Sequence, residues 1–187
     1  AELIVQNQSI NPKNTCFSMV RFGNVLGSSG SVVPLFKKQI AEGGPITLTH
    51  PKVVRYFMSI SEAAQLVIQT SELARGGEVF LLDMGDPVFI KDLAYQMVML
   101  SGASVKDKNN IRGDIEIKEI GMRPGEKLYE ELLIDSESIP TSHPLIFRAI
   151  EKKLDEEFFK FRLDKLISSL KKKDLDEALI CLLYTSP

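Results

Sequence analysis

The stretch Val20-Arg21-Phe22-Gly23-Asn24-Val25-Leu26-Gly27-Ser28-Ser29-Gly30-Ser31 decides how this chain is organised. Apolar, strand-forming residues at 15–22 run into it, its loop at 23–31 is polar and rich in glycine, and an apolar helical pattern at 32–42 follows. This order is typical of a buried strand, a ligand-facing loop and a helix. Small residues let the backbone approach a ligand closely and turn its amide groups toward an anion. The stretch therefore predicts an anion-facing loop at the end of a buried strand.

The spacing of the glycines distinguishes this loop from a dinucleotide-binding loop. Gly23, Gly27 and Gly30 read G-x-x-x-G-x-x-G, whereas the dinucleotide fingerprint is G-x-G-x-x-G. We therefore interpret the loop as facing a substrate. Asn24 is its most informative side chain, because an amide can donate to a phosphate or a carbonyl oxygen. The alternative is an asparagine that only holds its own loop together.

Strand and helix patterns alternate along the chain, which favours an α/β fold. Helices are predicted at 1–8, 32–42, 59–73, 90–100, 126–133, 158–170 and 175–183, and strands at 15–22, 46–49, 53–57, 78–83 and 114–120. At the start of the helix 59–73, Ser59 and Glu62 have the spacing of a capping box. Ala63, Val67 and Ile68 belong to the apolar face predicted for the same helix.

The composition excludes several classes of function. The 187 residues are 44% hydrophobic and 26% charged with a formal net charge of −2, so nothing favours nucleic acid or an acidic membrane as a partner. No apolar run approaches the roughly 18 residues that span a bilayer, and no signal peptide is recognised at the start. Cys16 and Cys181 form no C-x-x-C pair or Cys/His cluster, so no metal site is expected. We expect a cytoplasmic location.

A second special stretch is Gly121-Met122-Arg123-Pro124-Gly125-Glu126-Lys127. It differs from the phosphate-binding G-x-x-x-x-G-K-[ST] loop in spacing and in the last residue. We interpret it as a turn that presents Arg123 to a bound anion. Glu126 is predicted to open a helix, where it can bind ribose hydroxyls or serve as a plain helix-start carboxylate.

Arg55 and two histidines complete the set of candidate side chains. Arg55 stands among apolar and aromatic residues at 51–58, where a fully solvated side chain is not expected. Arginine favours two-pronged contact with phosphate or carboxylate, and the alternative is an edge-strand arginine paired with a surface carboxylate. His50 and His143 each precede a proline, and structural or exposed roles are expected for both. No pair of carboxylates stands out as an acid–base couple.

Taken together, residues 20–27, 30–34, 55–58 and 121–127, followed by Glu130-Glu131-Leu132, resemble the extended short-chain dehydrogenase/reductase family. Within that family the chain is similar to the C-terminal half of the polysaccharide-biosynthesis nucleotide-sugar dehydratases, the UDP-N-acetylglucosamine 4,6-dehydratase group. The resemblance implies the C-terminal part of a Rossmann-type fold that binds NAD or NADP, with a smaller substrate-binding domain.

The resemblance assigns four polar residues to the substrate. By position, Asn24 binds the diphosphate of a UDP-sugar, and Arg55 and Arg123 clamp it. Glu126 holds the ribose hydroxyls. Two arginine forks on one diphosphate agree with the chemistry of both groups.

The resemblance also assigns residues to the nucleoside and to the cofactor. Ser31, Val32 and Val33 border the nucleotide, and Thr47 lies near the uracil or the ribose. The backbone at Val25 meets the nicotinamide end of NAD or NADP.

The family's G-x-G-x-x-G and Y-x-x-x-K segments, which hold the dinucleotide and the catalytic lysine, do not occur in this chain. We therefore expect a substrate-binding portion that has no catalytic residue of its own, depends on other residues for most contacts with NAD or NADP, and is inactive alone. In the family mechanism the nicotinamide oxidises sugar C4, water is lost across C5–C6, and the hydride returns to C6. Alternatives are an epimerase, a C5-inverting dehydratase or a non-catalytic nucleotide-sugar-binding module.

The expected organisation has three parts. Residues 1–150 hold the late Rossmann elements and the UDP-sugar-binding domain, 151–180 form C-terminal helices, and 181–187 are a candidate non-native tail. For the whole protein the resemblance implies a homo-oligomer, and some relatives carry membrane helices ahead of this region. Membrane contact is not expected from these residues.

Overall fold

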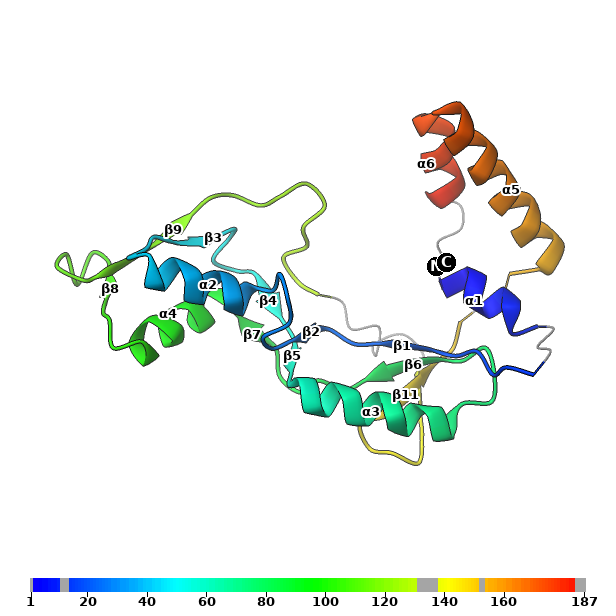
Figure 1. Cartoon of the computed structure of the whole chain (residues 1–187), viewed down its shortest axis with the longest axis horizontal. Coiled ribbons are helices and arrows are strands. Elements are labelled where there is room, and N and C mark those ends of the chain that lie inside the picture. The colour runs from blue at the N-terminus through cyan, green and yellow to red at the C-terminus, as the bar shows by residue number, and fades with distance from the viewer. Residues whose placement is uncertain (1, 11–13, 131–137, 152–153, 184–187) are drawn as a thin grey trace. The chain divides into compact units, whose positions relative to one another are not determined.

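The computed structural model describes residues 2–10, 14–130, 138–151 and 154–183, and its strands and helices confirm the predicted α/β class (Figure 1). The helices are α1 (Glu2–Gln8), α2 (Val32–Ala41), α3 (Ile60–Leu73), α4 (Ile90–Leu100), α5 (Glu156–Lys172) and α6 (Leu175–Leu183). The strands are β1 (Met19–Arg21), β2 (Asn24–Val25), β3 (Ile46–Leu48), β4 (Val54–Arg55), β5 (Phe57–Met58), β6 (Val79–Leu82), β7 (Val88–Phe89), β8 (Val105–Lys106), β9 (Ile115–Glu119), β10 (Ser138–Pro140) and β11 (Ile146–Ala149).

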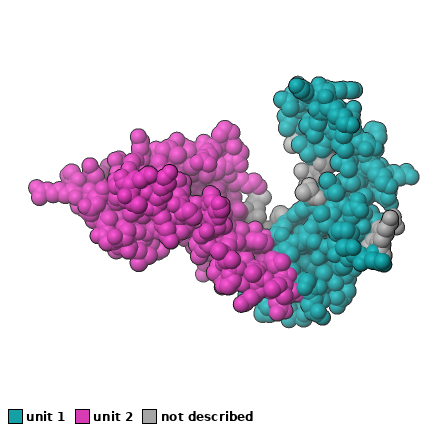
Figure 2. Space-filling view, viewed as in Figure 1, with its two compact units in different colours: residues 1–21, 70–81, 133–187 teal, residues 22–69, 82–132 magenta. Residues whose placement is uncertain are grey.

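The chain forms two compact units, which Figure 2 shows in different colours. Unit 1 contains residues 1–21, 70–81 and 133–187, and unit 2 contains residues 22–69 and 82–132. The predicted boundary near residue 150 stays a prediction, as does the non-native tail. Within that tail, Cys181 lies in α6 and is buried, and residues 184–187 fall outside the described residues.

Unit 1 is built on a sheet with the strand order β1-β6-β11-β10. β1 runs parallel to β6, with Met19 opposite Val79, and every residue of β6 is buried. The strand predicted at 15–22 is shorter than expected, because only Met19–Arg21 pair with β6, and they are half-buried at the edge of the sheet. The guanidinium of Arg21 pairs with Glu2 and, at 2.5 Å, with Glu151.

Unit 2 holds the apolar core that supports the candidate site. Its buried cluster consists of Phe36, Ile46, Leu48, Val53, Ile90, Ala94, Val98 and Ile115. These residues come from α2, α4, the β3 and β9 strands and a short extended segment, so the helices pack against the sheet β3-β9-β8. β3 and β9 are parallel, and the Ile120 N–H donates to the Leu48 carbonyl at 2.9 Å. The end of β3 therefore lies beside the start of the stretch 121–127.

The start of α3 confirms the predicted capping box. The Glu62 N–H donates to Ser59 Oγ at 3.2 Å, and the Ser59 N–H donates to Glu62 Oε2 at 2.8 Å. The predicted apolar face is wrong in part, because Ala63 is buried whereas Val67 and Ile68 are 40% and 67% exposed. The capping signal is local, but the side of a helix that turns inward depends on packing partners elsewhere in the chain.

The helix predicted at 126–133 is not observed among its described residues, 126–130, and residues 131–133 lie outside the described ranges. The Glu126 N–H instead donates to the Arg123 carbonyl at 3.0 Å, which closes a β-turn. Pro124 and Gly125 occupy its central positions, and Gly125 has a φ of 80°, as the third position of a type II turn requires. Glu126 is therefore not at the positive end of a helix. Of the helices described, none has the length and apolar character to cross a membrane.

Candidate functional site

The pairing of β2 with β5 brings Asn24 beside Arg55 within unit 2. The Asn24 N–H donates to the carbonyl of Tyr56, the residue after Arg55, at 2.9 Å. Gly23 makes this close approach possible, since a Cβ there would lie 3.0 Å from Met84 Sδ and 3.2 Å from the Tyr56 oxygen. The glycine that opens the loop is thus required by packing against two neighbours.

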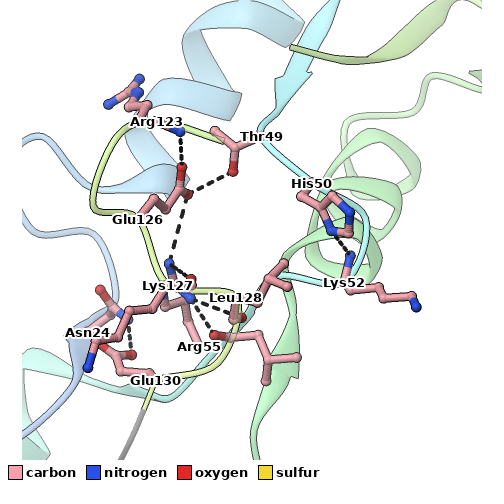
Figure 3. Close-up of polar contacts among 11 residues, drawn as sticks. Asn24, Thr49, His50, Lys52, Arg55, Arg123, Glu126, Lys127, Leu128 and Glu130 are labelled. Atoms are coloured by element: carbon pink, nitrogen blue, oxygen red, sulfur yellow. Dashed lines mark hydrogen bonds and ion pairs between the residues drawn. The ribbon is translucent and has the colours of Figure 1, made fainter. Parts of the chain in front are cut away.

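The Arg55 guanidinium is held by backbone carbonyls (Figure 3). Nη1 donates to Val54 O at 2.7 Å and to Leu128 O at 3.4 Å, and Nη2 donates to Lys127 O at 2.9 Å. A guanidinium has five N–H groups, so these bonds leave two of them for another acceptor. The side chain is 18% exposed, which keeps the remaining donors within reach of a ligand.

Glu126 faces Arg55 and is fixed by two hydrogen bonds. Its Oε1 accepts from Thr49 Oγ1 at 2.8 Å and lies 3.8 Å from Arg55 Nη2, and its Oε2 accepts from the Arg123 N–H at 3.0 Å. Burial by itself raises the pKa of the Glu126 carboxyl, but the Arg123 N–H, the Thr49 hydroxyl and the charges of Arg55 and Arg123 outweigh it. The pKa is therefore below its ordinary value, and Glu126 is an ionised acceptor at neutral pH.

Asn24 and Arg123 join this group in different ways. Asn24 Nδ2 donates to Glu130 Oε2 at 3.1 Å and to Tyr56 O at 3.3 Å. Arg123 contributes its backbone N–H, while Figure 3 shows its guanidinium directed away from the Glu126 carboxylate. The structure thus brings together Asn24, Arg55 and Glu126, and it places the Arg123 side chain at the exposed rim.

The remaining predicted residues make contacts around α2 and β3. Ser31 is the N-cap of α2, and its buried Oγ has no hydrogen-bond partner among the described residues. Val32 packs against the core cluster, and Val33 is half-buried in the first turn of the helix. Thr47 Oγ1 accepts from Gln39 Nε2 at 2.7 Å. The hydrogen bonds described for these residues do not reach Arg55 or Glu126.

Val25 and the two histidines show local roles. The Val25 carbonyl accepts from the Ser28 N–H at 3.2 Å, within its own loop. His50 Nδ1 accepts from the Lys52 N–H at 3.1 Å, and His143 Nδ1 accepts from the Leu145 N–H at 3.2 Å. Each histidine therefore stabilises a turn, in agreement with the structural role expected for it.

Thr49 and Glu130 also belong to the site, although the sequence assigned a role in binding to neither of them. Thr49 directly follows β3, and β9 leads into the stretch 121–127. Because β3 and β9 are parallel, the residues that follow them lie at the same edge of the sheet, and this position is the signal that points to Thr49. We find no comparable signal for Glu130, whose contact with Asn24 depends on the path of the chain after the turn.

The assembled groups suit an anionic ligand that also carries hydroxyl groups. Arg55 offers spare guanidinium donors, and Glu126 offers an ionised acceptor for hydroxyls. The Asn24 amide lies beside them with both of its N–H groups bonded. The described ranges contain no cluster of His, Cys, Asp or Glu side chains that could hold a metal ion.

The sequence profile of a family described as "Polysaccharide biosynthesis protein" matches residues 1–151. The capsular polysaccharide biosynthesis protein CapD of Staphylococcus aureus is 48% identical over 91% of this chain and 27% of its own length. A UDP-N-acetylglucosamine 4,6-dehydratase (inverting) of Campylobacter jejuni is 32% identical over 72% of this chain and 36% of its own length. A UDP-glucose 4-epimerase of Rickettsia massiliae is 35% identical over 68% of this chain and 34% of its own length. The chain thus spans about a quarter to a third of the relatives that it matches.

Solved structures give the same assignment of fold. The X-ray structure of Pen from Bacillus thuringiensis superimposes with a TM-score of 0.67 at 34% identity, over 83% of this chain and 47% of Pen. DesIV from Streptomyces venezuelae, a dTDP-glucose 4,6-dehydratase solved with NAD and TYD bound, superimposes with a TM-score of 0.58 at 18% identity, over 70% of this chain and 39% of DesIV. The second likeness concerns the fold alone. Together they confirm the expected Rossmann-type fold of the extended dehydratases and epimerases.

Proposed function

Because the chain belongs to the polysaccharide biosynthesis protein family, we propose that it binds the UDP end of a nucleotide sugar and positions that sugar for 4,6-dehydration. The observation that carries the proposal is the Arg55 guanidinium, which backbone carbonyls hold in place beside the ionised Glu126. A fixed guanidinium with unused donors is a preorganised receptor for a diphosphate.

The diphosphate is assigned to Arg55 and Asn24, with Arg123 at the exposed rim. Asn24 lies on β2 and Arg55 on β4, and the pairing of β2 with β5 joins the Asn24 backbone to Tyr56, the residue after Arg55. Arg123 is the first residue of the turn and is proposed to reach the same ligand by rotating its long exposed side chain. These donors match the acceptor-only chemistry of phosphate oxygens.

The ribose is assigned to Glu126, with Thr49 as its support. Thr49 donates to one carboxylate oxygen, and the Arg123 N–H donates to the other, which fixes the orientation of the acceptor. Each ionised oxygen has further lone pairs for ligand hydroxyls. Ser31, Val32 and Val33 are proposed to border the nucleotide, and Thr47 to lie near the uracil or the ribose. The Ser31 hydroxyl, which has no hydrogen-bond partner among the described residues, offers a polar contact at the start of α2.

Most contacts with NAD or NADP are proposed to come from other parts of the relatives' length, and the backbone at Val25 to meet the nicotinamide end. The 187 residues contain no G-x-G-x-x-G, and the Val25 carbonyl, which accepts from the Ser28 N–H, has a second lone pair. We assign the cofactor chemistry to other parts of the relatives' length. What these residues contribute is substrate positioning, which accounts for several kcal/mol of a barrier in well-oriented reactions. The chain alone is proposed to bind UDP-sugar without converting it.

Isothermal titration calorimetry with UDP, UDP-N-acetylglucosamine, uridine and NAD tests the proposal. We expect both UDP ligands to bind, uridine to bind at least about tenfold more weakly because it lacks the charged acceptors, and NAD not to bind. Arg123→Ala is expected to weaken UDP binding, whereas Arg112→Ala, at an exposed arginine ahead of β9, is the control that leaves it unchanged. Binding of NAD without UDP, or equal effects of the two variants, would show that the proposal is wrong.

An epimerase remains the second candidate, because the Rickettsia UDP-glucose 4-epimerase is about as similar to this chain as the Campylobacter dehydratase. Both reactions use the same nucleotide-binding end, so binding data do not separate them. Product NMR on the complete protein does, since dehydration gives a 4-keto-6-deoxy sugar and epimerisation gives the C4 epimer. Turnover of UDP-N-acetylglucosamine by the 187-residue chain with NAD would contradict the inactivity proposed for it.

A further inference from the structure

The side-chain amide of Asn24 is already fully used as a donor. Nδ2 donates to Tyr56 O at 3.3 Å and to Glu130 Oε2 at 3.1 Å. Both partners are pure acceptors, so the nitrogen and not the oxygen of the amide must face them. The group left to face a ligand is therefore Oδ1, which is an acceptor and cannot bind a phosphate oxygen.

This arrangement conflicts with phosphate binding by Asn24 unless one of its bonds is exchanged. The Tyr56 carbonyl belongs to the backbone between β4 and β5, where the Asn24 N–H also holds it. Glu130 is a side chain on the segment that follows the turn, and Asn24 is the partner of its carboxylate among the described residues. The bond to Glu130 is the one that a ligand can displace without disturbing the strand pairing.

From this geometry, and on the basis of the proposed function, we propose that Glu130 competes with the ligand diphosphate for the Asn24 amide and so sets the affinity of the site for nucleotides. The Glu130 carboxylate occupies the donor that a phosphate oxygen would use. It also places a negative charge where the anionic diphosphate must arrive, so a neutral side chain at this position favours the ligand twice.

Glu126 and Glu130 act in opposite directions, although both are carboxylates of one short segment. Glu126 is held by the Thr49 hydroxyl and by the Arg123 N–H. Its Oε1 lies 3.8 Å from Arg55 Nη2, which is beyond hydrogen-bond distance. It therefore does not consume the donors of the guanidinium. Glu130 does consume the donor of Asn24, so removal of its charge should strengthen UDP binding.

The test compares UDP with uridine by calorimetry on the 187-residue chain carrying Glu130→Gln or Glu130→Ala. We expect UDP to bind about tenfold more tightly to Glu130→Ala, which is about 1.4 kcal/mol, with a smaller gain for the isosteric Glu130→Gln. Uridine affinity should not change, because uridine has no diphosphate. The matched control is Glu116→Gln, which removes an exposed carboxylate from β9 and should change neither affinity.

A second pair of variants links the effect to Asn24. In an Asn24→Ala background the gain from Glu130→Ala should shrink to the part that comes from removing the negative charge, because the amide for which the two acceptors compete is gone. Circular dichroism and thermal unfolding establish that each variant is folded. Unchanged or weaker UDP binding by both Glu130 variants, an equal gain for uridine, or a gain that is undiminished in Asn24→Ala each overturns the inference.

The outcomes also separate this inference from the proposed function. If the unmodified chain binds UDP and Arg55→Ala weakens that binding about 100-fold, but the Glu130 variants show no gain, the inference alone fails. If neither the unmodified chain nor any Glu130 variant binds UDP, the proposed function fails and the inference with it. Binding that appears only in the Glu130 variants supports both.

Discussion

Replacement of Arg55 is the most informative perturbation of the site. Arg55→Ala removes the hydrogen bonds to Val54, Lys127 and Leu128 and the positive charge beside Glu126. Bonds from a charged donor contribute about 1.5–3 kcal/mol each when buried, but these carbonyls can be reached by water once the side chain is gone. We therefore expect a loss of about 2 kcal/mol from the free energy of unfolding of unit 2.

The loss of UDP affinity should be larger than the loss of stability. The two unused N–H groups of the guanidinium can form two charge-assisted bonds with the diphosphate, together worth about 3 kcal/mol, or about 100-fold in Kd. Arg55→Lys keeps the charge but not the planar fork, so we expect about tenfold weaker binding. Uridine affinity should change little in either variant.

Calorimetry at 25 °C measures the affinities, and urea unfolding followed by circular dichroism measures the stability separately. Arg112→Ala and Arg112→Lys serve as matched controls at an exposed arginine. A folded Arg55→Ala variant that binds UDP as tightly as the unmodified chain would refute the reasoning. Parallel losses for UDP and uridine would refute it as well, because they would mean that Arg55 acts through the fold and not on the diphosphate.

Three further predictions concern stability. Phe36 is 1% exposed in the core of unit 2, so Phe36→Ala should cost about 3–5 kcal/mol in urea unfolding, and Phe36→Leu much less. Ser59→Ala removes the cap of α3 and should cost about 1 kcal/mol by the same measurement, and unchanged stability would contradict the capping box shared with Glu62. The side-chain hydrogen bond from Arg21 lowers the pKa of the Glu2 carboxyl in the folded chain. The pair therefore stabilises unit 1 fully at pH values above the pKa that Glu2 has in the unfolded chain, about 4.3, and the stabilisation is lost as the pH falls through the lower pKa of the folded chain. Thermal unfolding between about pH 6 and pH 3 should show this loss, at most about 1 kcal/mol because solvent screens the pair, and Glu2→Gln should abolish it.

Residues close together in the sequence were enough to predict the helices of the core, whereas the length of a strand depended on the strand with which it pairs. α2 and α4 end near Gly43 and Gly102, where positive φ angles of 84° and 81° stop a helix whatever the rest of the chain does. The apolar run at 15–22 looked like one long strand, yet only the part that meets β6 is extended with a partner. Strand length depends on a neighbour that is distant in the sequence, and no window of residues carries that information.

The turn at Arg123–Glu126 shows how a correct motif led to a wrong element. Pro124 and Gly125 predicted a turn, and the turn is there. The error was to continue it as a helix from Glu126, whose carboxylate bonds back to the Arg123 N–H instead of capping a following helix. A carboxylate that serves the preceding turn and Thr49 at once is fixed more firmly than a helix-start side chain, which suits it to hold a ligand.

The site divides its donors and acceptors between two kinds of backbone. The donors, Asn24 and Arg55, stand on paired strands, and the acceptors, Glu126 and Glu130, stand on a segment without regular structure. Arg55 joins the two parts, because its guanidinium binds the Lys127 carbonyl of that same segment. Displacement of Glu130 therefore need not loosen the rest of the segment, since Thr49 still holds the Glu126 side chain and Arg55 still holds the Lys127 carbonyl. This is why the Glu130 variants are expected to raise affinity without loss of stability, whereas Arg55 variants must lose both.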